Sequence, residues 1–184
     1  MKSSDYIKKP VIDAFSKVYG SIKNKGIINL SLKDSFIVPD KFWDVLLADD
    51  DEDDREIFIE AISEVAPNVK IAAVKNGVEL MNRLTQDNAV LPDIIFLDLN
   101  MPCKSGEECL MEIRNHESLK DIPVVIYSTS SSKSDIDKTY QGGASYYITK
   151  PNSFNDLKTL AQRFFSINWT AKLWKPIKES FVFK

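Results

Sequence analysis

Five short apolar runs, separated by amphipathic helical patterns, constrain the fold of this 184-residue chain more than any other feature. The runs are rich in β-branched residues and occur at Val45–Ala48, Val69–Val74, Ile94–Leu97, Val124–Tyr127 and Tyr146–Thr149. Strand-like runs that alternate with helical patterns indicate βαβ units, which build a parallel sheet with helices on both faces. We therefore predict an α/β fold with a doubly wound sheet of five parallel strands.

The segments that follow these runs have the spacing of amphipathic helices, with apolar residues three or four positions apart. Asn76–Gly77 marks one predicted helix start, and Ser153 with Asp156 resembles a capping box at another. The pattern near Ser134–Gln141 is the weakest of the five. The apolar residues of the predicted helices are Phe58, Ala61, Ile62 and Val65; Val78, Met81 and Leu84; Cys109, Leu110 and Ile113; Ile136 and Tyr140; and Leu157, Leu160, Ala161 and Phe164.

Polar residues follow the ends of several predicted strands. Asp49 and Asp50 follow the first strand, Asp98 the third and Lys150 the fifth, and Ser128 ends the fourth. The carboxyl ends of parallel strands share one edge of a sheet, where α/β proteins bind ligands. A buried carboxylate there needs a cation, and clustered carboxylate oxygens suit Mg²⁺ or Mn²⁺. A lysine and a hydroxyl beside a carboxylate nucleophile can hold the oxygens of a transferring phosphoryl group.

Residues 44–167 resemble the receiver domain of response regulators, the phosphoacceptor module of two-component signalling. The matching positions, in the order and spacing of the family, are Asp49–Asp50, Asp98 in LDLNMP, Gly106, Ser128 at the end of VVIYS, Tyr147 and Lys150–Pro151. The resemblance implies a flavodoxin-like sheet with strand order 2-1-3-4-5. Residues 1–43 are then an N-terminal extension, and residues 168–184 a C-terminal tail.

The resemblance also implies a metal site. Asp98 would accept the phosphoryl group, and Asp50 and Asp98 would ligate Mg²⁺ or Mn²⁺. The backbone carbonyl of Asn100 would complete the set, with Asp49 acting through a water molecule. The three acids that follow are instead predicted to be solvated at a helix N-terminus, where negative charge is favourable. These acids are Asp51, Asp53 and Asp54.

Three further roles follow from the same resemblance. Ser128 and Lys150 would bind the phosphoryl oxygens, and Tyr147 would change rotamer on activation. The small neutral residues Asn100 and Ser130 occupy positions that tend to set the dephosphorylation rate in this family. The peptide bond between Lys150 and Pro151 is frequently cis in the family, so a cis bond is expected here as well.

The function implied is that of a single-domain response regulator. It would take a phosphoryl group from a histidine kinase or phosphotransfer protein, and signal by protein contact or onward phosphotransfer. It would catalyse only its own phosphorylation and dephosphorylation. One alternative is a haloacid-dehalogenase-like phosphohydrolase, which needs a second aspartate where this chain has Asn100. Another is a phosphorylation-independent interaction module, against which the complete acid, hydroxyl and lysine set argues.

The two extensions contain apolar residues that need a partner surface. Val11, Phe15, Val18 and Ile22 predict an amphipathic helix in the first extension. The tail holds several large apolar side chains, which pack either on the chain's own core or between two chains. Phytochrome-associated stand-alone receivers, which the tail and the PNSF segment resemble, often pair through such segments, so we favour a homodimer. The tail residues are Trp169, Leu173, Trp174, Ile177, Phe181 and Phe183.

Composition excludes several other classes of protein. The predicted domain carries 22 acidic and 12 basic residues, and the basic residues of the extensions are scattered, which argues against nucleic-acid binding. No apolar run approaches the length of a membrane span, and the N-terminus lacks a secretory signal. Cys103 and Cys109 lack metal-site spacing, so we expect reduced thiols in a cytoplasmic protein. The single histidine, His116, makes a Ser-His-Asp triad or a histidine-rich metal site very hard to build.

Overall fold

The computed structural model describes residues 42–167 and 177–184 of the chain. These residues belong to one compact unit, Pro39–Lys184. The helix predicted around Val11–Ile22 and the tail residues Trp169, Leu173 and Trp174 lie outside the described residues. Within the two described ranges, no helix is long and apolar enough to cross a membrane.

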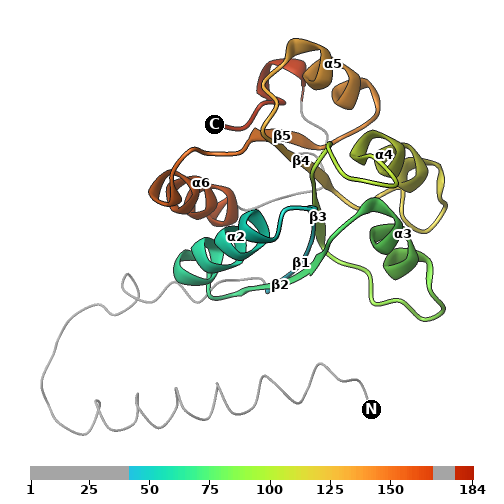
Figure 1. Cartoon of the computed structure of the whole chain (residues 1–184), viewed down its shortest axis with the longest axis horizontal. Helices are drawn as coiled ribbons and strands as arrows, with labels where there is room; N and C mark the ends of the chain where they lie inside the picture. Colours follow the sequence, from blue (N-terminus) through green and yellow to red (C-terminus); the bar gives the residue numbers. More distant parts are fainter. Residues whose placement is uncertain (1–41, 168–176) are drawn as a thin grey trace, which may run out of the picture. The chain divides into compact units, whose positions relative to one another are not determined.

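The sheet has the five parallel strands that the sequence pattern predicts, in the order β2-β1-β3-β4-β5 that the resemblance implies (Figure 1). The strands are β1 (Trp43–Ala48), β2 (Val69–Val74), β3 (Ile94–Leu97), β4 (Val124–Ser128) and β5 (Tyr146–Thr149). Two boundaries differ slightly from the prediction. β1 begins two residues early at the buried Trp43, and β4 includes Ser128, which pairs with Thr149 of β5.

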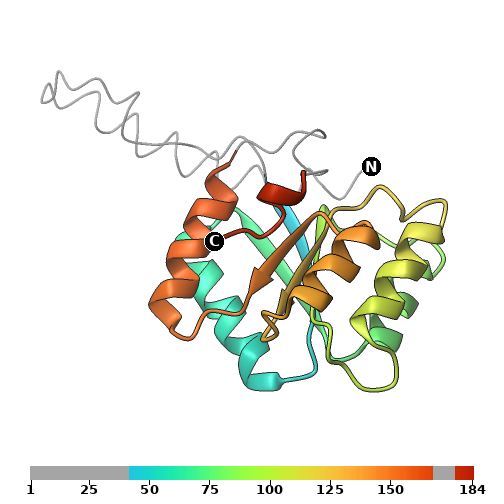
Figure 2. The same ribbon diagram turned by 90° about the horizontal axis from the view of Figure 1, so that it is seen from above.

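Helices cover both faces of the sheet (Figures 1 and 2). They are α2 (Glu52–Val65), α3 (Gly77–Thr85), α4 (Gly106–Asn115), α5 (Lys133–Gln141) and α6 (Phe154–Ser166). On one face, α2 and α6 pack over Phe96 and Tyr127, and Phe58 of α2 meets both rings edge to face at centroid distances of 5.1 and 5.0 Å. On the other face, α3, α4 and α5 share a second apolar core.

Each of these five helices begins at a capping residue in the loop that follows a strand. The cap side chain accepts a hydrogen bond from the backbone N–H three residues later, which satisfies a donor that the helix itself cannot pair. The caps are Asp51, Asn76, Ser105, Ser132 and Ser153. The predicted starts at Asn76 and Ser153 are therefore confirmed, although the reciprocal capping box occurs at α4, between Ser105 and Glu108.

One predicted core position is wrong. Val78 of α3 is 43% exposed, and Leu80, which the pattern left out, is fully buried. The cap at Asn76 fixes the rotation of the helix, so that Gly77, Leu80, Met81 and Leu84 face the sheet. Gly77 fits there because a Cβ at this position would lie 3.0 Å from the Cβ of Lys104 and still closer to that residue's carbonyl oxygen.

The end of the tail packs on the sheet beside β5. A short 3₁₀ turn, η2 (Lys178–Ser180), leads into Phe181, which is 1% exposed. The Tyr147 N–H donates to the Phe181 carbonyl at 2.9 Å, and the Phe183 N–H donates to the Tyr147 carbonyl at 2.9 Å. These bonds form a parallel bridge between Tyr147 and Val182, so residues 181–183 continue the sheet past β5. For this part of the tail, packing within the chain is confirmed.

The peptide between Lys150 and Pro151 is trans, because no peptide bond in the described ranges is cis. The expectation of a cis bond is therefore wrong. The backbone of Lys150 is held by the end of β4, because the Lys150 N–H donates to the Ser128 carbonyl at 2.8 Å.

The two cysteines are free thiols in different environments, and they should differ in reactivity. Cys103 is exposed, whereas burial raises the pKa of Cys109 to about 11. At pH 8 only about one Cys109 thiol in a thousand would be ionised, and only the thiolate reacts. We expect iodoacetamide to label Cys103 alone in the folded chain, as mapped by peptide mass spectrometry. In urea both should react. Rapid labelling of folded Cys103→Ser would contradict the packing of α4.

Candidate functional site

Backbone hydrogen bonds beyond the strand ends fix the residues of the site. The Asp49 N–H donates to the Val74 carbonyl at 3.1 Å, and the Asp98 N–H donates to the Ala48 carbonyl at 2.9 Å. Both aspartates therefore continue the register of their strands by one residue. With Lys150, which is held in the same way by β4, they meet at the carboxyl edge of the sheet, as the topology rule for such sheets requires.

Three carboxylates gather at this edge. Asp49, Asp50 and Asp98 each offer an oxygen, and these oxygens all lie within 4.8 Å of one another. Asp49 is fully buried and Asp98 is 5% exposed, whereas Asp50 is exposed. Each of the two buried aspartates has one oxygen in a hydrogen bond: Asp98 Oδ1 accepts from the Leu99 N–H at 2.7 Å, and Asp49 Oδ1 accepts from the Asp51 N–H at 3.1 Å.

The remaining oxygen of Asp49 makes the cluster a suitable cation site. Among the described residues, Asp49 Oδ2 accepts no well-directed hydrogen bond, although Lys150 Nζ lies 2.7 Å away. Burial raises the pKa of Asp49 above its ordinary value, and the neighbouring Lys150 opposes this shift. The Lys150 ammonium offsets part of the cost of burying this carboxylate, and the hard oxygen ligands of the cluster also suit Mg²⁺ or Mn²⁺.

The ammonium of Lys150 lies among acids, and its side chain is 8% exposed. Its Nζ lies 2.7 Å from Asp49 Oδ2, 2.7 Å from Asp54 Oδ2 and 3.8 Å from Asp98 Oδ2. It also lies 5.5 Å above the ring of Tyr127. Burial disfavours the charge, but the contacts with Asp49 and Asp54 and the charge of Asp98 outweigh it, so the pKa of Lys150 is raised.

A chain of hydrogen bonds connects the site with β5. Ser128 is fully buried, and its Oγ accepts from the Ser130 N–H at 3.4 Å. The Tyr147 hydroxyl donates to the Ser130 carbonyl at 2.8 Å, and Ser130 Oγ donates to Asp135 of α5 at 2.5 Å. Tyr147 is itself fully buried, with its ring edge to face with Phe181. Ser130 thus connects the strand that carries Ser128 with both β5 and α5.

The loop after Asp98 returns close to the backbone of Asp98 itself. Asn100 is exposed in this loop, and the Gly106 N–H donates to the Leu99 carbonyl at 3.0 Å. A Cβ on Gly106 would collide with the carbonyl oxygen of Asp98 and lie 2.9 Å from its carbonyl carbon. Only glycine allows α4 to start this close to the backbone of Asp98.

Gly106→Ala should therefore destabilise the fold by about 2 kcal/mol, because the obstructing atoms are backbone and cannot move aside cheaply. Urea denaturation measures the change. Gly142→Ala is the matched control, since its Cβ would meet Leu110 Cδ2 at 3.1 Å and the Lys138 carbonyl oxygen at 3.3 Å, contacts that need shifts of only a few tenths of an ångström, at an ordinary backbone angle. The control should cost less than about 1 kcal/mol. Equal costs would show that the collision with Asp98 is relieved without strain.

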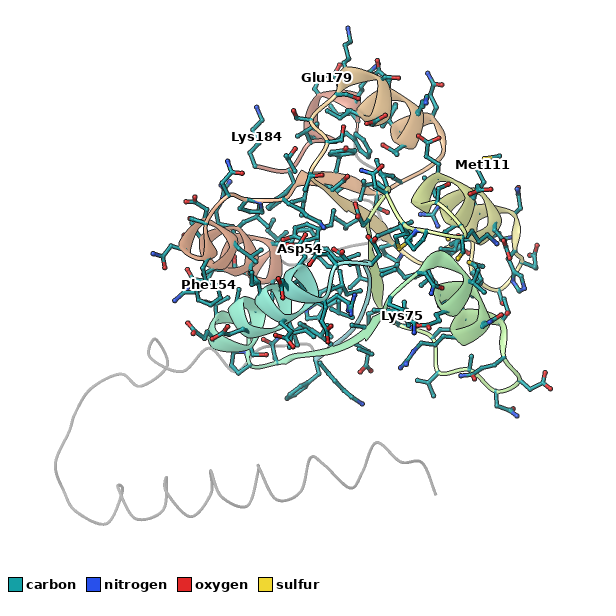
Figure 3. The ribbon with its side chains drawn as sticks, in the orientation of Figure 1. Asp54, Lys75, Met111, Phe154, Glu179 and Lys184 are labelled. Atoms are coloured by element: carbon teal, nitrogen blue, oxygen red, sulfur yellow. The ribbon has the colours of Figure 1, made fainter. Side chains whose placement is uncertain are left out.

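Two residues of the site were not identified from the sequence. The sequence predicts a solvated Asp54, but its carboxylate accepts a hydrogen bond from Lys150. The sequence predicts no role for Arg55, yet its Nη1 donates to the Asp49 carbonyl at 2.9 Å. The sequence signal that could place Asp54 is the cap at Asp51. A cap there starts the helix at a fixed residue, and this sets the direction in which Asp54, one turn on, points. Figure 3 labels Asp54 on α2.

The chain is similar to a known protein family and to proteins of known structure. The family model described as the response regulator receiver domain matches residues 45–162. The response regulator Rcp1 of a Synechocystis species is 32% identical over 122 residues, which cover 64% of this chain and 83% of that protein.

Two solved structures are also similar. The phosphorylated cyanobacterial phytochrome response regulator RcpA is 35% identical with a TM-score of 0.62, and the match covers 66% of this chain and 90% of RcpA. The Mn²⁺-bound form of Rcp1 is 31% identical with a TM-score of 0.62, and the match covers 67% of this chain and 92% of Rcp1.

Proposed function

The chain belongs to the response-regulator receiver domain family, and from this premise we propose that it is a single-domain response regulator whose Asp98 accepts a phosphoryl group. The observation that carries the proposal is the meeting of Asp98 with two other carboxylates and with Lys150 at one sheet edge. A phosphohydrolase of the haloacid-dehalogenase type would use Asn100 as an acid, which an amide cannot be.

In the proposed reaction, a carboxylate oxygen of Asp98 attacks the phosphorus of a phosphohistidine or acyl phosphate. The bond from phosphorus to the donor nitrogen or oxygen breaks, and the donor leaves with the electron pair. Ser128 and Lys150 hold the transferred oxygens by hydrogen bonds and charge. Asp50, Asp98 and the Asn100 carbonyl would hold Mg²⁺ or Mn²⁺, with Asp49 acting through water. The cation would neutralise charge on those oxygens.

The direct test is intact-mass spectrometry after incubation with acetyl phosphate and Mg²⁺. We expect the gain of one phosphoryl group, lost at alkaline pH and on omission of the metal, with peptide mapping to Asp98. Failure of the wild-type chain to gain this group from acetyl phosphate or from any histidine phosphotransfer donor would contradict the proposal.

Metal binding should be measurable without phosphorylation. Mg²⁺ or Mn²⁺ at ten times its dissociation constant should stabilise the fold by about 1.4 kcal/mol, because it binds only the folded cluster. Thermal unfolding with increasing metal measures this gain. Asp50→Ala should require much more metal for the same gain, whereas Asp53→Ala, an exposed acid three residues on, should behave like wild type. A gain that survives intact in Asp50→Ala would place the cation elsewhere.

The proposed output is a change around Ser128 and Tyr147. A phosphoryl group on Asp98 would draw the Ser128 hydroxyl inward by a new hydrogen bond and open a space for the ring of Tyr147, whose hydroxyl donates to the Ser130 carbonyl in this structure. Because Tyr147 is already fully buried, phosphorylation would favour this inward rotamer over an outward one, a population shift that needs only a few kcal/mol. Hydrogen exchange with and without a phosphoryl mimic should change in α5 and β5. Unchanged exchange there would contradict this switch.

The proposed donor is a histidine kinase or a phosphotransfer protein, and the proposed location is the cytoplasm. A homodimer formed through the tail, residues 168–184, is also proposed, although Phe181 of that tail packs on the core of its own chain. Sedimentation of the full chain against a version ending at Ile167 tests the dimer. A full chain that is monomeric at micromolar concentration would contradict it.

A further inference from the structure

Asp54 has no part in the reaction proposed above, yet it makes the best-directed contact with Lys150. The Lys150 ammonium donates a hydrogen bond to Asp54 Oδ2 at 2.7 Å across 96 residues of sequence. Its contact with Asp49 is equally short but less well directed, and Asp98 lies 3.8 Å away, beyond hydrogen-bonding distance. The lysine is therefore bound to α2 as well as to the sheet edge.

The two carboxylates that lie close to the ammonium differ in burial. Asp49 is fully buried at the end of β1, whereas the Asp54 side chain is 38% exposed on the first turn of α2. The ammonium carries three N–H donors, so two carboxylates leave one donor unused. A lysine has a flexible four-carbon stem and loses considerable rotamer entropy when it is held. A second anchor lowers the entropy that must be lost later, when a ligand arrives.

The helix itself does not need Asp54 in this role. Asp51 caps α2, and Glu52 and Asp53 also place negative charge in the first turn. Asp53 is exposed, whereas Asp54 is half-buried and turned toward Lys150. The two neighbouring acids therefore share charge and helix position but differ in contact with the lysine, which makes Asp53 a matched control.

We infer that Asp54 is a positioning residue for phosphoryl transfer: it holds the Lys150 ammonium between α2 and the sheet edge, with a donor left for the group arriving at Asp98. This inference rests on the proposed function of Asp98. Positioned charge of this kind acts on the transition state without reorganisation during the reaction, which is why a loss of position lowers the rate.

The test measures the rate at which acetyl phosphate phosphorylates Asp98, at saturating Mg²⁺ for each variant. Asp54→Ala should slow the reaction by about threefold to tenfold, the range for a partly exposed charge-assisted bond. Asp54→Asn removes the same charge but keeps an acceptor oxygen, so its rate should be intermediate. Asp53→Ala should react at the wild-type rate. Urea denaturation should give Asp54→Ala and Asp53→Ala similar stability.

A second measurement examines the anchor without any phosphodonor. Limited acetylation with acetic anhydride, mapped by mass spectrometry, should modify Lys150 faster in Asp54→Ala than in wild type or Asp53→Ala. An unchanged Lys150 reactivity would overturn the inference, as would an Asp54→Ala rate equal to or above wild type. Equal slowing in Asp53→Ala and Asp54→Ala would also overturn it, because that result reports only the charge of α2. A wild-type chain that is never phosphorylated at Asp98 overturns the proposed function as well.

Discussion

Replacing Asp98 with asparagine should abolish phosphorylation of the chain by acetyl phosphate and Mg²⁺. An amide is a far weaker nucleophile than a carboxylate, and the substitution also removes a charged ligand from the cation cluster. The shape of the side chain is preserved, and the Leu99 N–H retains an acceptor in the amide oxygen. Intact-mass spectrometry should therefore show no gain over a sample incubated without acetyl phosphate.

The matched control for this variant is Asp87→Asn. Asp87 is exposed in the loop that precedes β3, at the edge of the sheet away from the site, and its replacement removes the same single charge. The control should be phosphorylated like the wild type. If Asp98→Asn gained a phosphoryl group at another residue to the same extent, the assignment of Asp98 as acceptor would be wrong.

Phe181→Ala should destabilise the fold by about 3 kcal/mol, the lower end of the cost of truncating a buried phenylalanine. The ring is 1% exposed and packs against Tyr140 and Tyr147 at centroid distances of 5.2 and 6.2 Å. Its removal leaves a cavity between α5 and β5. Urea denaturation, followed by circular dichroism, measures the change.

Ile177→Ala is the control for the tail, because Ile177 is 67% exposed and its truncation should cost less than about 0.5 kcal/mol. The two results together separate a structural anchor from a loosely attached segment. If Phe181→Ala unfolds at the same urea concentration as Ile177→Ala, residues 181–183 detach before the sheet unfolds, and they contribute little to global stability.

The strands could be predicted closely because their signal is local. Val69–Val74, Ile94–Leu97 and Tyr146–Thr149 begin and end as predicted, since each is an apolar run bounded by polar or turn residues. The pairing of residues 181–183 with β5 could not be predicted in the same way. It depends on the open edge of β5 and on the space beside Tyr147, which exist only after the sheet has formed.

The residues of the site also divide into those that could be predicted from the sequence and one that could not. Asp49, Asp50, Asp98, Ser128 and Lys150 could be placed because each follows or ends its own strand, and the topology brings strand ends together. The role of Asp54 could not be predicted, because it depends on a contact with the long side chain of Lys150, which lies 96 residues away in the sequence. Local reasoning identified it correctly as a first-turn acid, but not the cation that it contacts.

The capping pattern also shapes the electric field at the site. In the described part of the chain, five helices begin at the edge where the strands end, and each N-terminus carries the equivalent of roughly half a positive elementary charge. Four of the five caps are uncharged serine or asparagine, although each first turn also holds at least one acidic residue, which cancels part of this positive potential. This positive potential partly offsets the clustered acids. An anionic phosphodonor therefore meets less repulsion at this edge than the acidic composition of the domain alone would suggest.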